Sequence, residues 1–212
     1  MADRPILHSY FRSSASYRVR IALNLKGIAY DDAFHHLRRR EHKAADYLAL
    51  NPQGLVPALE MPDGVLTQSL AICEYLDELV SEPPLLPADP IERAQVRAFA
   101  LAIACEVHPL QNLATLDRLR GLGASEEQVT LWARDVISEG LDACVRLIAT
   151  RNGPFCFGDR VTLADLCLVP QLANARRFDV PLDQPRLTVI EANCLGLPAF
   201  QRARPENQPD AE

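Results

Sequence analysis

A proline-rich stretch between two different hydropathy patterns constrains the fold more than any other feature of the sequence. Residues 81–90 contain Pro83, Pro84, Pro87 and Pro90. Proline fixes φ and has no backbone N–H, so a run this dense interrupts helices and strands alike. Before it, strand patterns alternate with helical ones, and after it nearly every pattern is helical. The chain of 212 residues is therefore predicted to form an α/β domain over 1–83 and an all-helical domain over 84–212.

In the first domain, the spacing of apolar residues predicts the order strand, helix, strand, helix, hairpin, helix. Gly27 ends the first helix, and Pro57 marks the start of the hairpin, whose turn is Pro62-Asp63-Gly64. Ser69 is the expected N-cap of the last helix. The predicted ranges are 6–9, 14–26, 28–34, 44–50, 56–67 and 70–79.

The second domain begins with one long helical pattern over 91–119, in which Pro109 is expected to cause a kink. Two further helices open on residues that can cap reciprocally, Ser125 with Gln128 and Thr162 with Asp165. Short helices are predicted at 187–194 and 198–203, and the polar tail from residue 204 is expected to fray.

Charge and hydropathy exclude several classes of function. The net charge of −6 argues against non-specific nucleic-acid binding, and an anionic substrate would have to be bound by local arginines. No apolar run approaches the roughly 20 residues of a membrane span. The first five residues, 1–5, lack the apolar core of a signal peptide. We therefore expect a soluble cytosolic protein.

The cysteines predict neither a metal site nor a disulfide framework. There are six, at positions 73, 105, 144, 156, 167 and 194, with no C-x-x-C pair and no histidine at metal-ligand spacing from two of them. Most lie in apolar helical patterns, where cysteine behaves as a small hydrophobic residue. Buried, reduced thiols are expected, and they agree with a cytosolic location.

Two polar stretches are candidates for binding. Ser13-Ser14 stands at the start of the first helix, where a hydroxyl either caps the helix or points at an anion or thiolate. The stretch 35–43 is strongly basic. Its members either form a solvated face or include one or two that hold a carboxylate.

Several motifs, spread over nearly the whole length, resemble the soluble glutathione transferases and, within them, the zeta class. Motifs common to the superfamily are Val56-Pro57 and Gln68-Ser69. Those typical of the class are Ser13-Ser14-Ala15 with Arg18-Val19-Arg20, and Asn174-Ala175-Arg176-Arg177-Phe178. Further matches are Asn51-Pro52, Leu110-Gln111-Asn112-Leu113 and the stretch 162–171. The chain departs from the class at Ala15, where the family usually has cysteine.

The resemblance implies a thioredoxin-like first domain that binds glutathione, and a homodimer. It implies Ser13 and Ser14 as the catalytic residues that stabilise the thiolate, because a helix N-terminus with a hydroxyl donor lowers a thiol pKa. It also implies a cis peptide bond before Pro57. The implied glutathione-binding residues are Ser13, Ser14, Ala15, His42, Val56, Gln68, Ser69, His108 and Asn112. His108 and Asn112 are four apart and are expected to share a helical face.

The activity implied by the resemblance is isomerisation of maleylacetoacetate to fumarylacetoacetate, in the catabolism of phenylalanine and tyrosine. A thiolate adds to the activated alkene, the single bond rotates, and elimination regenerates glutathione. Arg12 and Arg177 are the expected partners of the substrate carboxylates, with Arg176 as an alternative to Arg177. Arg18 and Arg20 are expected in surface or interdomain ion pairs. No metal is implied.

Other functions stay open at this stage. Maleylpyruvate is an alternative substrate, and a general glutathione transferase or peroxidase is an alternative enzyme. A non-catalytic interaction protein is disfavoured, because a scaffold does not need the set of Ser13-Ser14, Val56-Pro57 and Gln68-Ser69. Ala15 excludes a covalent role for a protein thiol at that position.

Overall fold

The computed structural model describes residues 4–212 and divides them into two compact units. Residues 1–3, which begin the predicted first domain and the N-terminal segment 1–5, lie outside the described residues. The first unit ends at Leu85, and it takes up 195–212 again. The second unit is Leu86–Cys194. The predicted helical domain, 84–212, included residues 195–212. In the structure these residues belong to the first unit.

The first unit is built on a mixed four-stranded sheet, in the order β2-β1-β3-β4. Strand β1 (Ile6–Ser9) pairs in parallel with β2 (Asp31–Phe34) and antiparallel with β3 (Ala58–Met61), which pairs antiparallel with β4 (Gly64–Thr67). The hairpin is confirmed. The second strand is shorter than predicted, because the N–H of Ile28 bonds back to the carbonyl of Leu23 and delays the strand.

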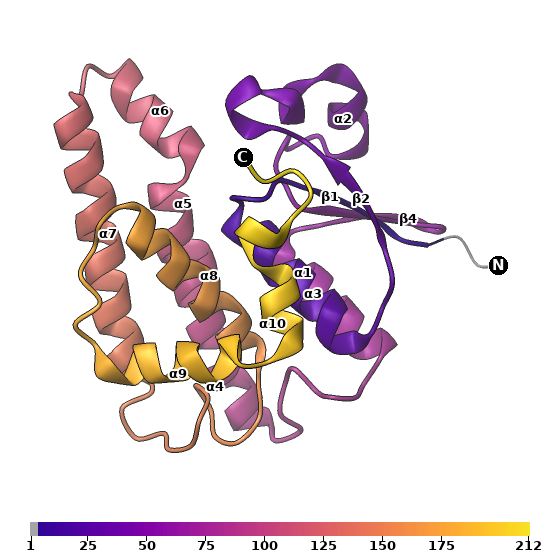
Figure 1. Cartoon of the computed structure of the whole chain (residues 1–212), viewed down its shortest axis with the longest axis vertical. Coiled ribbons are helices and arrows are strands. Elements are labelled where there is room, and N and C mark those ends of the chain that lie inside the picture. Colours follow the sequence, from indigo (N-terminus) through magenta and orange to yellow (C-terminus); the bar gives the residue numbers. More distant parts are fainter. Residues whose placement is uncertain (1–3) are drawn as a thin grey trace. The chain divides into compact units, whose positions relative to one another are not determined.

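Helices α1 (Ser14–Lys26) and α3 (Ser69–Leu79) pack together on one side of the sheet, and α2 (Ala45–Leu50) lies on the other (Figure 1). Gly27 ends α1 in the left-handed conformation, at φ 65°, as predicted. The N-cap of α3 is Gln68, not Ser69. Gln68 has a positive φ of 69°, so the chain turns one residue earlier than expected and Ser69 enters the first helical turn.

The C-terminal segment is anchored within the first unit. Helix α10 (Pro198–Ala203) packs on α1, and Asn24 donates to the carbonyl of Ala199 over 3.1 Å. The tail was expected to fray, but the N–H of Phe11 donates to the Asp210 carboxylate at 3.0 Å and Gln208 is buried. These bonds hold the tail against the loop that leads into α1.

The second unit is helical. Its helices are α4 (Pro90–Leu101), α5 (His108–Gln111), α6 (Leu113–Gly121), α7 (Glu126–Leu147), α8 (Leu163–Arg177) and α9 (Pro185–Leu195), with a π-helical segment at Ala102–Val107. The long pattern breaks at Asn112, which is extended at ψ 162°, and not at Pro109. Helix α5 continues directly from the π-helical segment, so Pro109 lies inside an unbroken helical run, and the departure from α-helical geometry falls in Ala102–Val107, directly before it.

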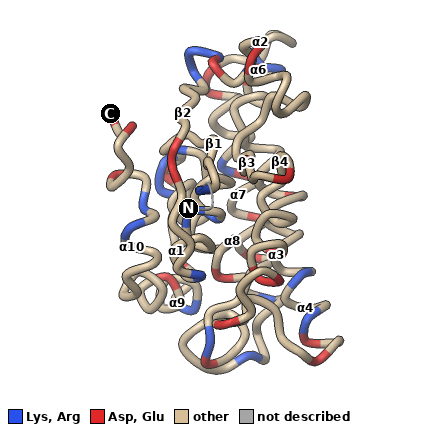
Figure 2. The backbone as a smooth tube through the Cα atoms, turned by 90° about the vertical axis from the view of Figure 1, so that its right-hand side faces the viewer, with Lys and Arg blue, Asp and Glu red and all other residues tan. Residues whose placement is uncertain are grey.

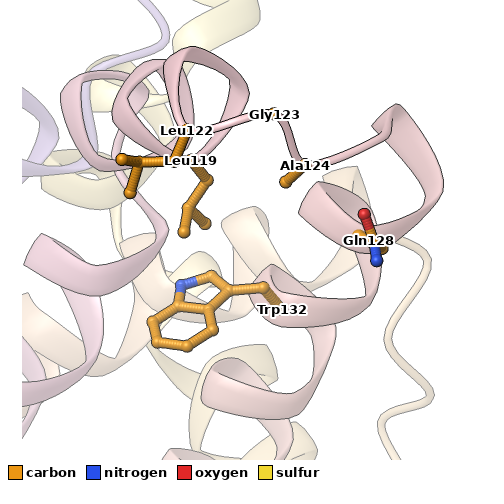
Figure 3. A pocket seen from close by; sticks show the side chains of 6 residues that line it. All are labelled: Leu119, Leu122, Gly123, Ala124, Gln128 and Trp132. Carbon is orange, nitrogen blue, oxygen red and sulfur yellow. The ribbon is translucent and has the colours of Figure 1, made fainter.

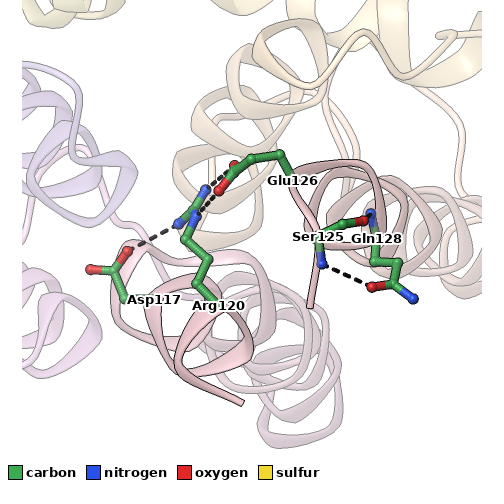
Figure 4. A network of polar contacts seen from close by, with 5 residues as sticks. All are labelled: Asp117, Arg120, Ser125, Glu126 and Gln128. Atoms are coloured by element: carbon green, nitrogen blue, oxygen red, sulfur yellow. Dashed lines mark hydrogen bonds and ion pairs between the residues drawn. The ribbon is translucent and has the colours of Figure 1, made fainter. Parts of the chain in front are cut away.

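Both predicted capping pairs are present. The N–H of Ser125 donates to Gln128 Oε1 at 2.8 Å, and the N–H of Gln128 donates to Ser125 Oγ at 3.2 Å (Figure 4). The buried Asp165 carboxylate accepts from the N–H of Thr162 at 2.8 Å and from that of Cys156 at 2.8 Å. It therefore joins the start of α8 to the preceding loop.

Charged residues of both signs are interspersed along the described chain (Figure 2). None of the helices in residues 4–212 is long and apolar enough to cross a membrane.

Candidate active site

Four segments of the first unit meet the sheet at the same end: three strands end there, and β3 begins there. The register sets His8 opposite Ala58, and Ala58 opposite Thr67. The chain leaves β1 toward Ser13 and leaves β4 toward Ser69, beside the start of β3 at Val56-Pro57. Because β2 runs parallel to β1, the basic stretch that holds His42 begins at this end as well. The fold therefore brings together the predicted glutathione-binding residues of the first domain.

The two serines at the start of α1 have different environments. Ser13 is the N-cap, and its Oγ accepts from the N–H of Ser16 at 3.1 Å. It is half-buried, and the cap uses only a lone pair, so the hydroxyl proton can still be donated. Ser14 is buried, and among the described residues its Oγ has no hydrogen-bond partner. Ala15 follows at 8% exposure. The cap hypothesis is therefore confirmed for Ser13, whose hydroxyl proton is not used by the cap.

The three arginines near this turn also differ. Arg12 is half-buried, and its guanidinium carbon lies 5.0 Å from the centre of the Phe11 ring. The expectation of ion pairs for Arg18 and Arg20 is wrong, because both are buried side chains of α1. Arg20 donates to the carbonyls of Phe11 and Ala203, each at 3.0 Å, and burial lowers its pKa to about 10. The helical spacing of apolar residues did not predict that Arg18 and Arg20 are buried, because α1 is buried on every side and not along one apolar face.

The start of β3 is held by its neighbours. The Val56-Pro57 peptide bond is cis, as the resemblance implied. The preceding carbonyl, of Leu55, accepts from Tyr47 Oη at 2.6 Å and from Asn51 Nδ2 at 2.8 Å. No sequence pattern singled out Tyr47. The feature that could have pointed to Tyr47 is an aromatic hydroxyl on the short helix α2. Burial raises the Tyr47 pKa to about 12, so the hydroxyl keeps its proton and stays a donor.

Gln68 and Ser69 lie at the N-terminus of α3. Gln68 is exposed and donates from Nε2 to Gln53 Oε1 at 2.9 Å. Ser69 is buried and accepts from Arg18 Nη1 at 3.1 Å. The N-terminal N–H groups of a helix lack intrahelical partners and attract anions, so this turn suits a carboxylate.

His42 belongs to a short 3₁₀ turn, Glu41–Lys43, in the basic stretch. Its Nδ1 is buried and has no hydrogen-bond partner in the described part of the chain. Burial lowers the His42 pKa, with further lowering by Lys43 and Arg40, so the ring is neutral at pH 7. The neighbouring Arg38, Arg39, Arg40 and Lys43 are exposed, which confirms the solvated face.

A histidine pair beside the sheet was not foreseen. His8 Nδ1 lies 2.9 Å from His35 Nε2, and His8 Nε2 lies 3.2 Å from a Glu60 carboxylate oxygen. Burial, followed by the neighbouring His8, lowers the His35 pKa. His8 and Glu60 are adjacent through the β1–β3 register, a contact that only strand pairing creates. No group of residues within 4–212 has the arrangement of a metal site.

The remaining predicted residues belong to the second unit. His108 begins α5, but Asn112 lies outside that helix, and its Oδ1 accepts from the N–H of Thr115 at 3.0 Å to cap α6. The expectation of a shared helical face is therefore wrong. Arg177 is exposed and donates to Asn174 Oδ1 at 3.1 Å. The alternative, Arg176, is occupied by a two-bond ion pair with Glu191.

A hollow of about 410 Å³ lies at the turn between α6 and α7 (Figure 3). Its lining includes Leu119, Leu122 and the ring of Trp132, whose Nε1 donates to the carbonyl of Leu110 at 2.8 Å. Beside it, Arg120 bonds Glu126 at 2.7 Å and Asp117 at 3.0 Å, which closes the turn (Figure 4). None of the predicted site residues lines this hollow, and its lining has no titratable side chain.

Two family models match the chain. Residues 7–84 match the glutathione S-transferase N-terminal domain, and residues 91–192 match the C-terminal domain. The chain belongs to the glutathione S-transferase family. Together with the mixed sheet and the helical unit, these matches establish the thioredoxin-like plus all-helical transferase fold.

Relatives within this family are similar over their full length. A maleylacetoacetate isomerase of Rhizobium meliloti is 50% identical over 97% of this chain and 98% of its own. The Mus musculus maleylacetoacetate isomerase is 44% identical over 99% and 96%.

Solved transferase structures agree. A zeta-class bacterial maleyl pyruvate isomerase in its holo form has a TM-score of 0.95 at 45% identity, covering 98% of this chain and 100% of that one. A Methylobacterium extorquens maleylacetoacetate isomerase with bound malonate and glutathione has a TM-score of 0.94 at 40% identity, covering 98% and 99%.

Proposed function

We propose that this transferase is a glutathione-dependent isomerase that converts maleylacetoacetate to fumarylacetoacetate. The observation that carries the proposal is the meeting of two helix N-termini, those of α1 and α3, with the start of β3 at one end of the sheet. The relatives named maleylacetoacetate isomerase, at 50% and 44% identity over nearly the full chain, support the reaction.

The residues present fit glutathione, which carries two carboxylates, an ammonium group and a thiol. The N-terminus of α3, with Ser69, suits the γ-glutamyl carboxylate, and Gln68 is exposed beside it. The backbone of Val56, next to the cis bond at the start of β3, is the proposed partner of the cysteinyl amide, which would pair as an added strand. His42 offers a ring nitrogen for the glycyl end. The buried His42 Nδ1, which has no hydrogen-bond partner among the described residues, agrees with a polar ligand here.

Ser13 is the proposed thiolate partner. Its hydroxyl caps α1 as an acceptor and keeps its proton for donation, while the helix N-terminus adds partial positive charge. Ser14 Oγ is enclosed, so we assign Ser14 a role through the backbone at the first turn. When bound, glutathione supplies a thiolate that can add to an activated double bond and leave again. Arg12, directly before Ser13, is the proposed partner of a substrate carboxylate.

Maleylpyruvate is the second candidate substrate. A maleylpyruvate isomerase of a Ralstonia species is 46% identical over 97% of this chain. Both compounds present an activated cis double bond beside a carboxylate, so the residues of the first unit do not separate them. We also propose a homodimer in the cytosol, acting in the catabolism of phenylalanine and tyrosine.

The test combines binding and turnover. Calorimetry should detect glutathione binding, and isomerisation of maleylacetoacetate and maleylpyruvate should be followed with and without glutathione. A chlorinated aromatic electrophile serves as the control for general transferase activity. Faster turnover of the aromatic than of both cis acids would overturn the isomerase, and the absence of glutathione binding would revive a non-catalytic role.

A further inference from the structure

Arg18 is a buried cation without a counter-charge. The side chain lies on α1 at 1% exposure, and its Nη1 donates to Ser69 Oγ at 3.1 Å. Its Nε and Nη2 are buried without hydrogen-bond partners in the described part of the chain, where no carboxylate pairs with it either. A buried guanidinium costs folding free energy unless its charge and donors are compensated.

The other buried cations of α1 are compensated. Lys26 donates to Asp77 Oδ1 on α3 and to the carbonyl of Pro83, both at 2.6 Å. Arg20 donates to backbone carbonyls. Arg18 is therefore the exception on this helix, and within the described residues the only side chain to which its guanidinium donates is Ser69, at the N-terminus of α3.

The hydrogen bond sets the direction of the Ser69 hydroxyl. Arginine is a donor only, so Ser69 Oγ must accept from it. The hydroxyl proton then cannot point at Arg18 and is left for an acceptor on the other side. The fixed positive charge behind Ser69 adds to the partial charge of the helix N-terminus. Screening by water is weak at this depth, so an anion in front of Ser69 is attracted by both.

We infer that Arg18 is a positioning residue for the γ-glutamyl carboxylate of glutathione, acting through Ser69. This inference rests on the proposed function. It assigns Arg18 no contact with the ligand: the guanidinium orients the Ser69 hydroxyl and supplies the charge that the carboxylate neutralises.

The experiment compares two ligands on the full chain. One is glutathione, and the other is 4-aminobutanoyl-cysteinylglycine, which lacks only the γ-glutamyl carboxylate. The wild type should bind glutathione the more tightly of the two. Arg18→Met should lower that preference about tenfold, the effect of losing a hydrogen bond and charge next to an ionised group. Affinity for the analogue should stay nearly unchanged.

Lys26→Met is the matched control. It also removes a buried cation that joins α1 to α3, so it should lower the melting temperature and leave the ratio of the two affinities as in the wild type. An Arg18→Met variant that weakens both ligands equally would overturn the inference, because a purely structural role predicts that result.

Further variants decide the remaining cases. Should Arg18→Met not fold, Arg18→Lys keeps the charge but loses the rigid planar donors of the guanidinium. We expect Arg18→Lys to lose part of the preference for glutathione over the analogue. An unchanged preference overturns the inference. In a Ser69→Ala background, the change at residue 18 should have a smaller effect on the ratio. A wild type that does not bind glutathione would refute the proposed function, whereas normal binding with an unaltered ratio in the variants refutes only the role of Arg18.

Discussion

Ser13→Ala is the substitution that tests the proposed site most directly, because Ser13 has two separable tasks. Loss of the N-cap bond to the N–H of Ser16 should cost about 1 kcal/mol of unfolding free energy. Loss of the donor to the thiolate removes roughly 2 kcal/mol of preference for the charged form. That is equivalent to a pKa change of about 1.5 for the bound thiol, from about 7 back to the ordinary value of about 8.5.

The consequence at pH 7 is a fall in the ionised fraction of bound glutathione, from about one half to about 3%. The assay is a pH titration of thiolate ultraviolet absorbance in the complex, with the pH profile of kcat/KM alongside it. The ionised fractions of variant and wild type should converge above pH 9, where the thiol is ionised in both. Urea unfolding measures the cap separately.

Ser14→Ala is the control one residue further on. Its Oγ is buried without a partner among the described residues, so removing it should leave stability unchanged or slightly raised. The thiol pKa should not move. A raised thiol pKa in Ser14→Ala with a normal value in Ser13→Ala would show that the assignment of the two serines is reversed. No change in either variant would mean that the N-terminus of α1 does not stabilise the thiolate.

Three further predictions concern other parts of the molecule. Asp165→Ala leaves two buried N–H groups without their acceptor and should lower the unfolding free energy by about 3 kcal/mol or more, measured in urea. Since burial lowers the His42 pKa, the ring gains charge only below the ordinary histidine range, so the affinity for glutathione should rise as the pH falls below that range; calorimetry across pH should show this rise in the wild type and not in His42→Ala. Among the cysteines only Cys105 is exposed, so a thiol reagent should modify one thiol rapidly in the folded protein and the others only after denaturation; rapid modification of several would contradict the burial.

Local signals predicted much of the backbone. Ser125 and Gln128 form the reciprocal cap that their spacing indicated, and Gly27 ends α1 in the left-handed conformation. These features depend on bonds between residues close in sequence, so spacing is enough to find them. The N-cap of α3 was missed by one residue, because the positive φ of Gln68 is set by its surroundings and not by its own preference.

The chemistry of the site divides in the same way. The family resemblance implied that Ser13, Val56-Pro57 and Ser69 hold glutathione, and the sequence could carry it because the motifs at these helix and strand starts are local features. Only the tertiary structure decided that these segments leave the sheet at one end, through the β1–β3–β4 register.

The same holds for Arg18 and for the tail. Arg18 reads as a surface arginine in the sequence, but α1 packs against both α3 and α10, and the side chain is buried against Ser69 at the start of α3. The tail reads as a fraying end, yet Asp210 accepts from Phe11. Such contacts join residues far apart in the sequence, and their free energy depends on burial that no local pattern encodes.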